Sequence, residues 1–513
     1  MATNIMNCDL AVVGSGGSGL VAAVKARDLG VKNVIILEAA KKPGGCSWFA
    51  GFGAQGYTKW QKEAGYPDTT DDNFRRIMLS YQWDINHKLI RNYVDSGGPM
   101  FDWLHELCDV SDFFSKPQPY VKPASGPQGG PQSMMAMGRR REPNYETWYH
   151  INEKSRDPSI GPGRGGSYLV TRMLEQCEKM GIRVITEARA REFIKDRKGN
   201  VTGLSADTKE GKLQVNFKAC VLAAGGFGRN KEKLKKQWPE FFPSNGLYLH
   251  LFSVPTCQGD SLEMAEHTGA LMDYESRSIN WQIGGPVHHP YSFTIFKIVQ
   301  FPEVIYVNLN GERFFNEKDL VFTAHWALTK QPKAVCYAIV DDDMVETMDE
   351  KFNETSPGEE WPFNNDGLRK DIEYEAALDE GGAPGNHTKI ADTFEELAKK
   401  MDMDPQAFVA TMNRYNEYCE KGRDLDFYKQ QEYLIPIRKP PFYAFWCQRF
   451  SETTHGGIVI NENMELLNAG TNKPMPGLFA SGDNASAMEG GMGWAAVSGY
   501  MAGIAAAKYL GKA

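Results

Sequence analysis

Residues 10–23, Leu-Ala-Val-Val-Gly-Ser-Gly-Gly-Ser-Gly-Leu-Val-Ala-Ala, are the stretch that decides the fold. The four apolar residues Leu10–Val13 have the composition of a short buried strand, and they run directly into a glycine-rich turn. A segment of helical composition follows the turn and stops at Gly30. A second apolar run, Val34–Leu37, then ends in Glu38, nineteen residues after Gly19. This order of strand, glycine turn, helix, strand and acid predicts a dinucleotide-binding unit.

The residues of this unit have separate predicted tasks. Gly14 makes the tight turn, Gly16 lets the backbone approach a pyrophosphate, and Gly19 lets the helix pack on the strand. The helix N-terminus offers N–H donors and a positive partial charge to the phosphates, and Glu38 accepts hydrogen bonds from a ribose. The predicted cofactor-binding residues here are Gly14, Gly16, Gly17, Ser18, Gly19, Glu38 and Ala39.

Two further segments indicate which dinucleotide is bound. A second glycine-rich stretch follows the ribose acid, and folds that bind NAD alone have little need for it; its predicted cofactor-binding residues are Gly44, Gly45, Cys46, Ser47 and Gly51. Near the C-terminus, an apolar strand over residues 477–480 ends in Gly482 and Asp483, and a helix over residues 494–510 follows it, with Ala496 and Val497 at the cofactor. These segments resemble FAD-binding flavoproteins. The resemblance implies that Asp483 holds the ribityl chain and that the helix N-terminus faces the flavin, where its positive end stabilises the reduced, anionic form.

The middle of the chain supplies the remaining strands of the predicted domain. A helix over residues 168–180 is followed by strands at 184–186 and 201–204 and by a buried strand at 219–223 that ends in a glycine pair. We predict cofactor contacts here from Ala190, Ala224, Gly225 and Gly226. The expected fold class is α/β. A discontinuous Rossmann-like FAD-binding domain, a parallel sheet with helices, spans residues 1–249 and 439–513, and an α+β capping domain at 250–438 is inserted into it.

Composition excludes several classes of protein. The 513 residues are 42% hydrophobic and 24% charged, and their net charge of −8 argues against a surface that binds nucleic acid. The nine cysteines form no CxxC or haem-attachment motif, so we expect neither an iron–sulfur cluster, a haem nor another metal. There is no apolar run of roughly 18 residues or more and no export signal at the start, which predicts a cytoplasmic protein without a membrane span.

Motifs along the whole chain resemble one superfamily in particular. It is the fumarate reductase and succinate dehydrogenase flavoprotein superfamily, in the branch that also contains 3-ketosteroid dehydrogenases and urocanate reductase. Besides the segments above, the resemblance rests on residues 259–265, 310–317, 392–398, 414–418 and 454–457. It implies redox chemistry at a carbon–carbon bond beside a carbonyl or carboxyl group: hydride passes to or from flavin N5, and a protein group handles the proton. FAD is expected to be held noncovalently, although Cys46 falls where succinate dehydrogenases attach FAD through a histidine.

The same resemblance suggests catalytic residues. Arg313, in Gly-Glu-Arg-Phe, matches an arginine that donates a proton to substrate in fumarate reductases, and its structural alternative is a buried clamp with Glu317. His455 and His289 do not fall on the superfamily's histidine positions, but they are candidates to polarise or protonate the substrate, and their structural alternative is packing.

The last glycine-rich loop supplies two more candidates. The backbone N–H of Gly491 can donate a hydrogen bond to a ketone oxygen. Glu489 lies in the same loop, and its alternative is an exposed charge.

Other positions depart from the superfamily's dicarboxylate enzymes. The histidine and the arginine that hold the substrate carboxylates there fall on Thr453 and about Gly493 here, so the bidentate clamp is missing. The catalytic tyrosine of ketosteroid dehydrogenases falls on Phe322.

We therefore expect an ene-reductase, or a dehydrogenase run in reverse, for a small neutral or monocarboxylate unsaturated carbonyl compound. A separate reduced flavin or redox protein is expected to donate the electrons. The alternatives are a 3-ketosteroid dehydrogenase or reductase, a fumarate reductase-like enzyme acting on a carboxylate, and a flavoprotein subunit that passes electrons to a partner.

Overall fold

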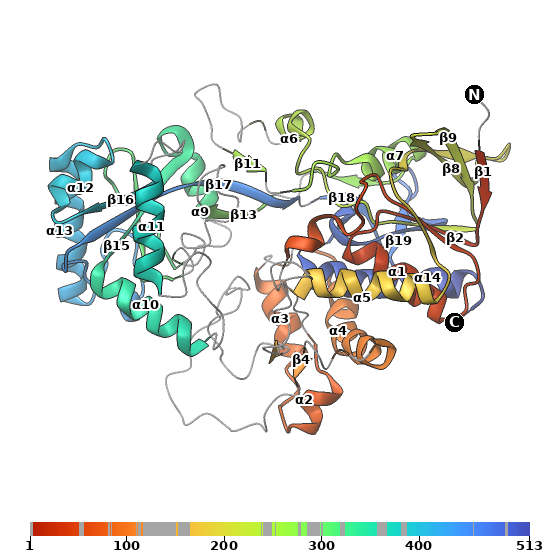
Figure 1. Ribbon diagram of the computed structural model, residues 1–513, viewed down its shortest axis with the longest axis horizontal. Coiled ribbons are helices and arrows are strands. Elements are labelled where there is room, and N and C mark those ends of the chain that lie inside the picture. Colours follow the sequence, from red (N-terminus) through yellow and green to blue (C-terminus); the bar gives the residue numbers. More distant parts are fainter. Residues whose placement is uncertain are drawn as a thin grey trace.

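The computed structural model describes most of the chain. The described residues are 4–50, 56–80, 83, 85–108, 110, 114–115, 150–151, 165–237, 239, 249–251, 253–274, 279–284, 298, 301–318, 324–355, 367–380, 387–454, 456–487 and 491–512. Two parts lie side by side in Figure 1, with strand β17 (Phe442–Thr454) running from one toward the other.

A six-stranded sheet forms the centre of the first part, on the right of Figure 1. Its order is β19-β20-β10-β2-β3-β6, and every neighbouring pair except β19 with β20 is parallel. All four residues of β2, β3 and β10 are buried, as expected of central parallel strands covered on both faces. The strands are β2 (Leu10–Val13), β3 (Val34–Leu37), β6 (Arg183–Ile185), β10 (Ala219–Leu222), β19 (Glu465–Leu467) and β20 (Pro474–Ala480).

Helices cover one face of this sheet and a second sheet covers the other (Figure 1). The helices are α1 (Gly17–Asp28), α5 (Gly165–Lys179) and α14 (Met492–Tyr509). The second sheet, ordered β1-β9-β8-β7, comprises β1 (Asn4–Asn7), β7 (Arg189–Lys195), β8 (Val201–Thr208) and β9 (Gly211–Asn216). Helix α7 (Asp260–Thr268) lies beside β7, and α6 is Lys231–Gln237. The predicted strand–turn–helix segments are thus present, so the sequence correctly predicted this parallel α/β architecture.

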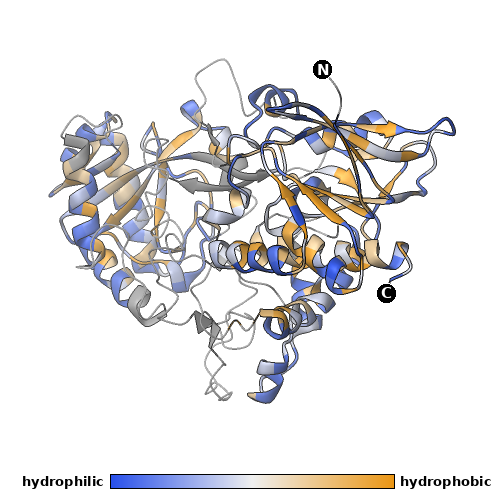
Figure 2. Cartoon of the chain, turned by 45° about the vertical axis from the view of Figure 1, so that its right-hand side comes forward, coloured by the Kyte–Doolittle hydropathy of each residue, from blue (hydrophilic) through white to orange (hydrophobic). Residues whose placement is uncertain are grey.

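A mixed sheet forms the second part, on the left of Figure 1. Its central strand is β17, which pairs with β11 (Leu249–Leu251), β13 (Ile279–Gly284), β15 (Val335–Asp341) and β16 (Thr388–Ala391), while β14 (Ile305–Asn308) pairs with β15. The surrounding helices are α9 (Ala324–Thr329), α10 (Asp342–Thr355), α11 (Leu368–Glu380), α12 (Phe394–Lys400) and α13 (Pro405–Lys421). Figure 2 shows hydrophobic segments gathered in the strands and hydrophilic ones on the outer helices.

The pairing of β17 bears on the domain boundaries. The sequence predicts that residues 439–513 belong to the FAD-binding domain, whereas residues 442–454 form the middle strand of the mixed sheet in the second part. Conversely, two elements of the predicted 250–438 cap contact the first part. Helix α7 packs on β7, and β12 (Met272–Asp273) pairs with β18 (Gly457–Val459). We therefore propose a cap that begins after about residue 273 and ends at Thr454, with β11 also in its sheet.

Smaller elements complete the first part. Helices α2 (Lys59–Glu63), α3 (Thr70–Ser80) and α4 (His87–Cys108) lie below the parallel sheet in Figure 1, and α4 contacts α14. Short strands are β4 (Phe114–Ser115), β5 (His150–Ile151) and β21 (Ala485–Ser486), and short 3₁₀ turns are Gly45–Phe49 and Gly482–Asn484. Two other 3₁₀ turns, Pro332–Ala334 and Gln431–Tyr433, belong to the second part. Within the described residues, no helix combines the length and apolarity needed to cross a bilayer.

Candidate cofactor and active site

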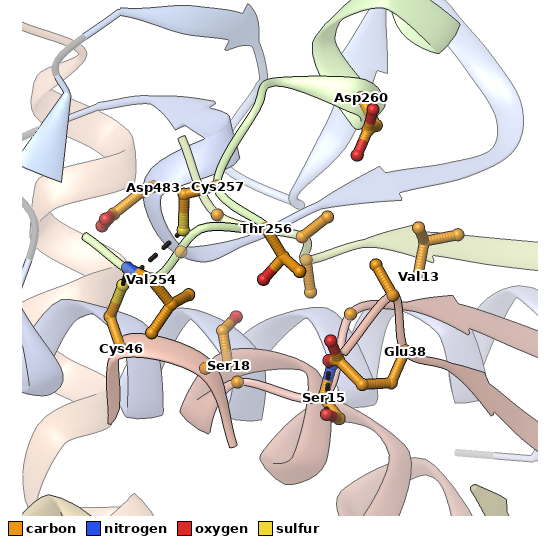
Figure 3. A pocket seen from close by; sticks show the side chains of 18 of the residues that line it. Val13, Ser15, Ser18, Glu38, Cys46, Val254, Thr256, Cys257, Asp260 and Asp483 are labelled. Atoms are coloured by element: carbon orange, nitrogen blue, oxygen red, sulfur yellow. Dashed lines mark hydrogen bonds between the residues drawn. The ribbon is translucent and has the colours of Figure 1, made fainter. Parts of the chain in front are cut away.

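A pocket opens at the carboxyl ends of the central parallel strands, where open α/β sheets bind their ligands. One wall comes from the glycine turn after β2, the end of β3 and the Gly45–Phe49 turn. The facing wall comes from residues 254–260 before and at the start of α7, and Figure 3 shows the two walls as separate ribbons.

Two glycines of the first turn, Gly14 and Gly19, are required by close backbone contacts. Gly14 has φ +102°, and a Cβ there would lie 2.4 Å from the Ala223 carbonyl oxygen. A Cβ on Gly19 would lie 2.0 Å from the Gly14 carbonyl oxygen, so only glycine fits where the helix packs on this turn. Gly16 differs, because its nearest neighbour would be Ser47 Oγ at 3.8 Å. Its pocket side is therefore open to a ligand.

The N-terminus of α1 points at this open space. The Gly16 N-cap provides no side-chain hydrogen bond, and the first turn carries no acidic residue. The 12-residue helix therefore presents a positive end and backbone donors that suit a pyrophosphate. The Gly17 N–H donates to Ser47 Oγ at 2.8 Å, which fixes the second glycine-rich segment against the first.

Glu38 is held in place at one end of the pocket. Its Oε2 accepts hydrogen bonds from the Ser15 N–H at 3.0 Å and from Ser15 Oγ at 2.5 Å, and its Oε1 accepts from the Ala40 N–H at 2.7 Å. Ser15 Oγ also accepts from the Gly44 N–H at 3.2 Å. Because these bonds orient the carboxylate before any ligand arrives, Glu38 fits the predicted ribose-binding role.

Asp483 lies at the opposite end of the pocket (Figure 3). Its neighbour Gly482 accepts a hydrogen bond from Trp494 Nε1 at 3.1 Å and donates its N–H to Ser498 Oγ at 2.9 Å, so two residues of α14 fix the turn. Burial raises the pKa of Asp483 to about 7. A carboxylate enclosed in this way suits hydroxyl donors such as those of a ribityl chain.

The raised pKa gives a prediction for the Asp483→Asn apoprotein. Since the usual value of 3.8 lies below the folded value of about 7, ionisation destabilises the folded wild type as pH rises between the two. The variant should be the more stable protein at about pH 8, by up to about 4 kcal/mol, and should match wild type near pH 4. Urea unfolding at both pH values measures this. An equal stability difference at both would contradict the assignment.

Most predicted cofactor-binding residues line this one pocket. They are Gly14, Gly16, Gly17, Ser18, Glu38, Ala39, Gly45, Cys46, Ser47, Ala190, Ala224, Gly225, Gly482 and Asp483. Five others, Gly19, Gly44, Gly226, Ala496 and Val497, are not among its lining residues, and Gly51 lies outside the described residues. Ala496 and Val497 are fully buried in α14, whereas Ala495 reaches the pocket, one position earlier on the helix.

The sequence prediction missed the second wall of the pocket. Val254, Thr256, Cys257 and Asp260 line it, and Asp260 holds the lining residue Arg189 in an ion pair of 2.9 Å. Only Asp260 lies within the superfamily motif at residues 259–265; Val254, Thr256 and Cys257 precede that motif. Ser15, Val13, Leu37, Ala188, Ala223 and Ala495 also line the pocket without having been predicted.

Arg313 lies in the second part, away from this pocket. Its guanidinium donates to both oxygens of Glu317 at 2.8 Å and to Asp424 at 2.9 and 3.3 Å, and its side chain is 1% exposed. It also lies over the rings of Tyr415 and Phe427. Burial by itself lowers the pKa of Arg313, but the Glu317 and Asp424 carboxylates outweigh burial and hold it above its usual value. These contacts match the structural alternative, since a more tightly held proton makes a poorer acid.

The remaining catalytic candidates divide into two groups. His455, Glu489 and His289 lie outside the described residues, so their roles stay predictions. Gly491 is the N-cap of α14 with φ +112°, and a Cβ there would meet no atom within 4 Å. In the described part of the chain, no cluster of three or more His, Cys, Asp or Glu side chains is arranged to hold a metal ion.

The sequence profile of the family described as FAD binding domain matches residues 9–498. The chain belongs to the FAD binding domain family. FAD is therefore the dinucleotide for which the pocket is built, and the pocket's glycine turn, oriented Glu38 and uncapped α1 fit it. Bound FAD supplies two-electron redox chemistry, so the protein is an FAD-dependent oxidoreductase.

Known relatives of this FAD-binding protein are similar over nearly its whole length. Vinyl phenol reductase of Lactiplantibacillus plantarum is 25% identical over 98% of this chain and 96% of its own. Fumarate reductase (cytochrome) of Shewanella frigidimarina is 27% identical over 98% of this chain and 78% of its own. The solved 3-ketosteroid-Δ4-(5α)-dehydrogenase of Rhodococcus jostii RHA1 shares the fold, with a TM-score of 0.68 at 22% identity over 98% of this chain and 97% of its own.

Proposed function

We propose that this flavoprotein reduces, or in reverse desaturates, a carbon–carbon double bond conjugated to a carbonyl or single carboxyl group of a small molecule. The observation that carries the proposal is that the N-terminus of α14 lies uncapped next to the Asp483 end of the cofactor pocket. Gly491 caps this helix without a side-chain hydrogen bond, and the turn that follows, Met492-Gly493-Trp494, carries no cationic side chain.

The chemistry of such a helix end suits a carbonyl oxygen. When hydride adds to the double bond, negative charge develops on the conjugated oxygen, and preorganised N–H donors stabilise that charge. The uncapped end of α14 offers backbone donors and a positive partial charge. Because it offers no guanidinium, it lacks the bidentate grip that a second substrate carboxylate needs. The proposed electron donor is external, a reduced flavin or a redox protein.

A second candidate substrate class comes from one relative. Vinyl phenol reductase resembles the chain over 98% of its length, and its name indicates an alkene conjugated to a phenol ring. We include this class because a vinylphenol that loses its phenolic proton and is protonated at its terminal carbon becomes a quinone methide. The oxygen of the quinone methide gains negative charge when hydride adds, and helix N–H groups can stabilise that charge.

The experiment compares substrates against the reduced protein. The holoprotein is reduced anaerobically with dithionite and mixed with an enone, a cinnamate-type monocarboxylate, 4-vinylphenol, a steroid enone or fumarate, and flavin reoxidation is followed by absorbance. We expect reoxidation by the enone, the monocarboxylate or 4-vinylphenol at least about 100-fold faster than by fumarate, the equivalent of about 2.7 kcal/mol of lost carboxylate binding.

Two outcomes would overturn the proposal. If fumarate were the fastest oxidant, the protein would be a fumarate reductase-like enzyme that acts on a dicarboxylate. Failure of all the alkenes, together with rapid reoxidation by a redox protein, would favour an electron-transfer subunit instead.

A further inference from the structure

Two thiols face each other across the cofactor pocket, at its Asp483 end. Cys46 and Cys257 are 211 positions apart in the chain, and their Sγ atoms lie 3.6 Å apart. Figure 3 shows Cys46 on the wall formed by the Gly45–Phe49 turn and Cys257 on the facing wall, before α7. Neither side chain has a task in the proposed reaction.

The two sulfurs have different surroundings. Cys46 is partly exposed, and its Sγ accepts a hydrogen bond from the Val254 N–H at 3.4 Å. Cys257 is buried, and the Sγ–Sγ contact together with burial raises the pKa of its thiol well above the usual value. A Cβ on Gly225 would lie 3.4 Å from Cys257 Sγ, so the glycine leaves room for this sulfur. Cys257 therefore holds its proton tightly, and Cys46, which is the more accessible of the two, is the thiol that a reagent meets first.

We propose that Cys46 and Cys257 form a reversible disulfide by exchange with a small-molecule disulfide of the glutathione class. The Cys46 thiolate attacks one sulfur of the reagent, forming a mixed disulfide and releasing one thiolate. The Cys257 thiol then loses its proton and attacks Cys46 Sγ, which forms the internal disulfide and releases the second thiolate. The protein loses two electrons and two protons, and the reagent becomes two thiols.

Little movement is needed to close this bond. The sulfurs must approach from 3.6 Å to about 2.05 Å, or by about 1.6 Å. The new bond would join the Gly45–Phe49 turn to the segment before α7, and these two segments form facing walls of the FAD pocket. The disulfide therefore acts as a covalent strap that retains bound FAD. The inference rests on the FAD site and is independent of the substrate class.

The test uses the holoprotein without substrate. After treatment with glutathione disulfide and removal of the reagent, we expect titratable thiols in the denatured protein to fall from nine to seven. Peptide mass spectrometry should find Cys46 linked to Cys257. Release of FAD, followed by its fluorescence after dilution, should slow at least tenfold, and dithiothreitol should restore the original rate.

Serine variants separate the specific bond from general oxidation. Cys46→Ser and Cys257→Ser should each abolish the linked peptide and the slow release. Cys108→Ser, which removes another partly exposed thiol, should leave both unchanged. If Cys257→Ser fails to fold, Cys46→Ser still decides the question, because its side chain is the less buried of the two.

Three results would overturn the inference. One is a linked peptide only between Cys336 and Cys447, which lie opposite each other on β15 and β17 and are fully buried. Another is accumulation of the mixed disulfide without any internal bond. The third is formation of the internal disulfide with an unchanged rate of FAD release, which would show that the disulfide does not retain FAD. None depends on finding a substrate, so failure here is distinguishable from failure of the proposed function.

Discussion

The Arg313→Met protein should unfold at a clearly lower urea concentration than wild type, with a loss of about 3–5 kcal/mol. The side chain is 1% exposed and is paired with Glu317 and Asp424, both fully enclosed, while Lys429 Nζ lies 3.5 Å from Glu317. Removing the guanidinium leaves two buried carboxylates, of which Glu317 keeps Lys429 Nζ as a neighbouring cation. Because neither carboxylate can reach water, the cost is that of an uncompensated buried charge.

An exposed ion pair in the same part of the chain provides the control. Arg438 pairs with Glu420, and both side chains are at least half exposed, so Arg438→Met should cost less than about 1 kcal/mol. The predicted proton-donor role of Arg313 leads to a different pattern. If Arg313→Met kept wild-type stability and lost turnover, the arginine would act on substrate and the structural assignment would be wrong.

The Gly14→Ala protein should lose FAD during purification, with an affinity at least about 100-fold weaker, or about 2.7 kcal/mol. The new Cβ would lie 2.4 Å from the Ala223 carbonyl oxygen, and both residues line the pocket. The φ of +102° adds strain for any residue with a side chain. Fluorescence titration of the apoprotein with FAD measures the change.

Gly30 provides a matched control for this prediction. Its φ is +95°, close to that of Gly14, but a Cβ there would meet no atom within 4 Å. Gly30→Ala therefore carries similar backbone strain without the clash and lies at the far end of α1. Its FAD affinity should stay within about threefold of wild type, or about 0.7 kcal/mol. Equal losses of affinity in both variants would show that strain alone, rather than the clash at the turn, weakens binding.

The local pattern of the sequence predicted the cofactor side of the molecule well. Four-residue apolar runs have few alternatives to buried parallel strands, so β2, β3 and β10 were predictable, and so was the position of Glu38 at the end of β3; its ribose-binding role stays a prediction. The side-chain register on α14 differs from the prediction: the sequence predicts pocket contacts from Ala496 and Val497, but Ala495 lines the pocket. A shift of one helical residue turns a side chain by roughly 100°, which composition alone does not resolve.

Contacts between distant segments were beyond what the sequence pattern could predict. Nothing local to Cys46 indicates that Cys257 faces it, and nothing local to Gly-Glu-Arg-Phe indicates that Asp424, 111 residues later, encloses Arg313. Strand β17 is apolar enough to belong to either sheet, and only its pairing with β15 and β16 places it in the cap. These features depend on tertiary packing.

The product of a single turnover tests the central claim most directly. The reduced holoprotein is mixed anaerobically with one equivalent of the alkene that reoxidises it fastest, and the products are identified by mass spectrometry. Reduction of a conjugated double bond predicts one saturated product, two hydrogens heavier than the alkene, for each FAD reoxidised. Reoxidised FAD with the alkene recovered unchanged would contradict the account, since the electrons would then have left the protein by another route.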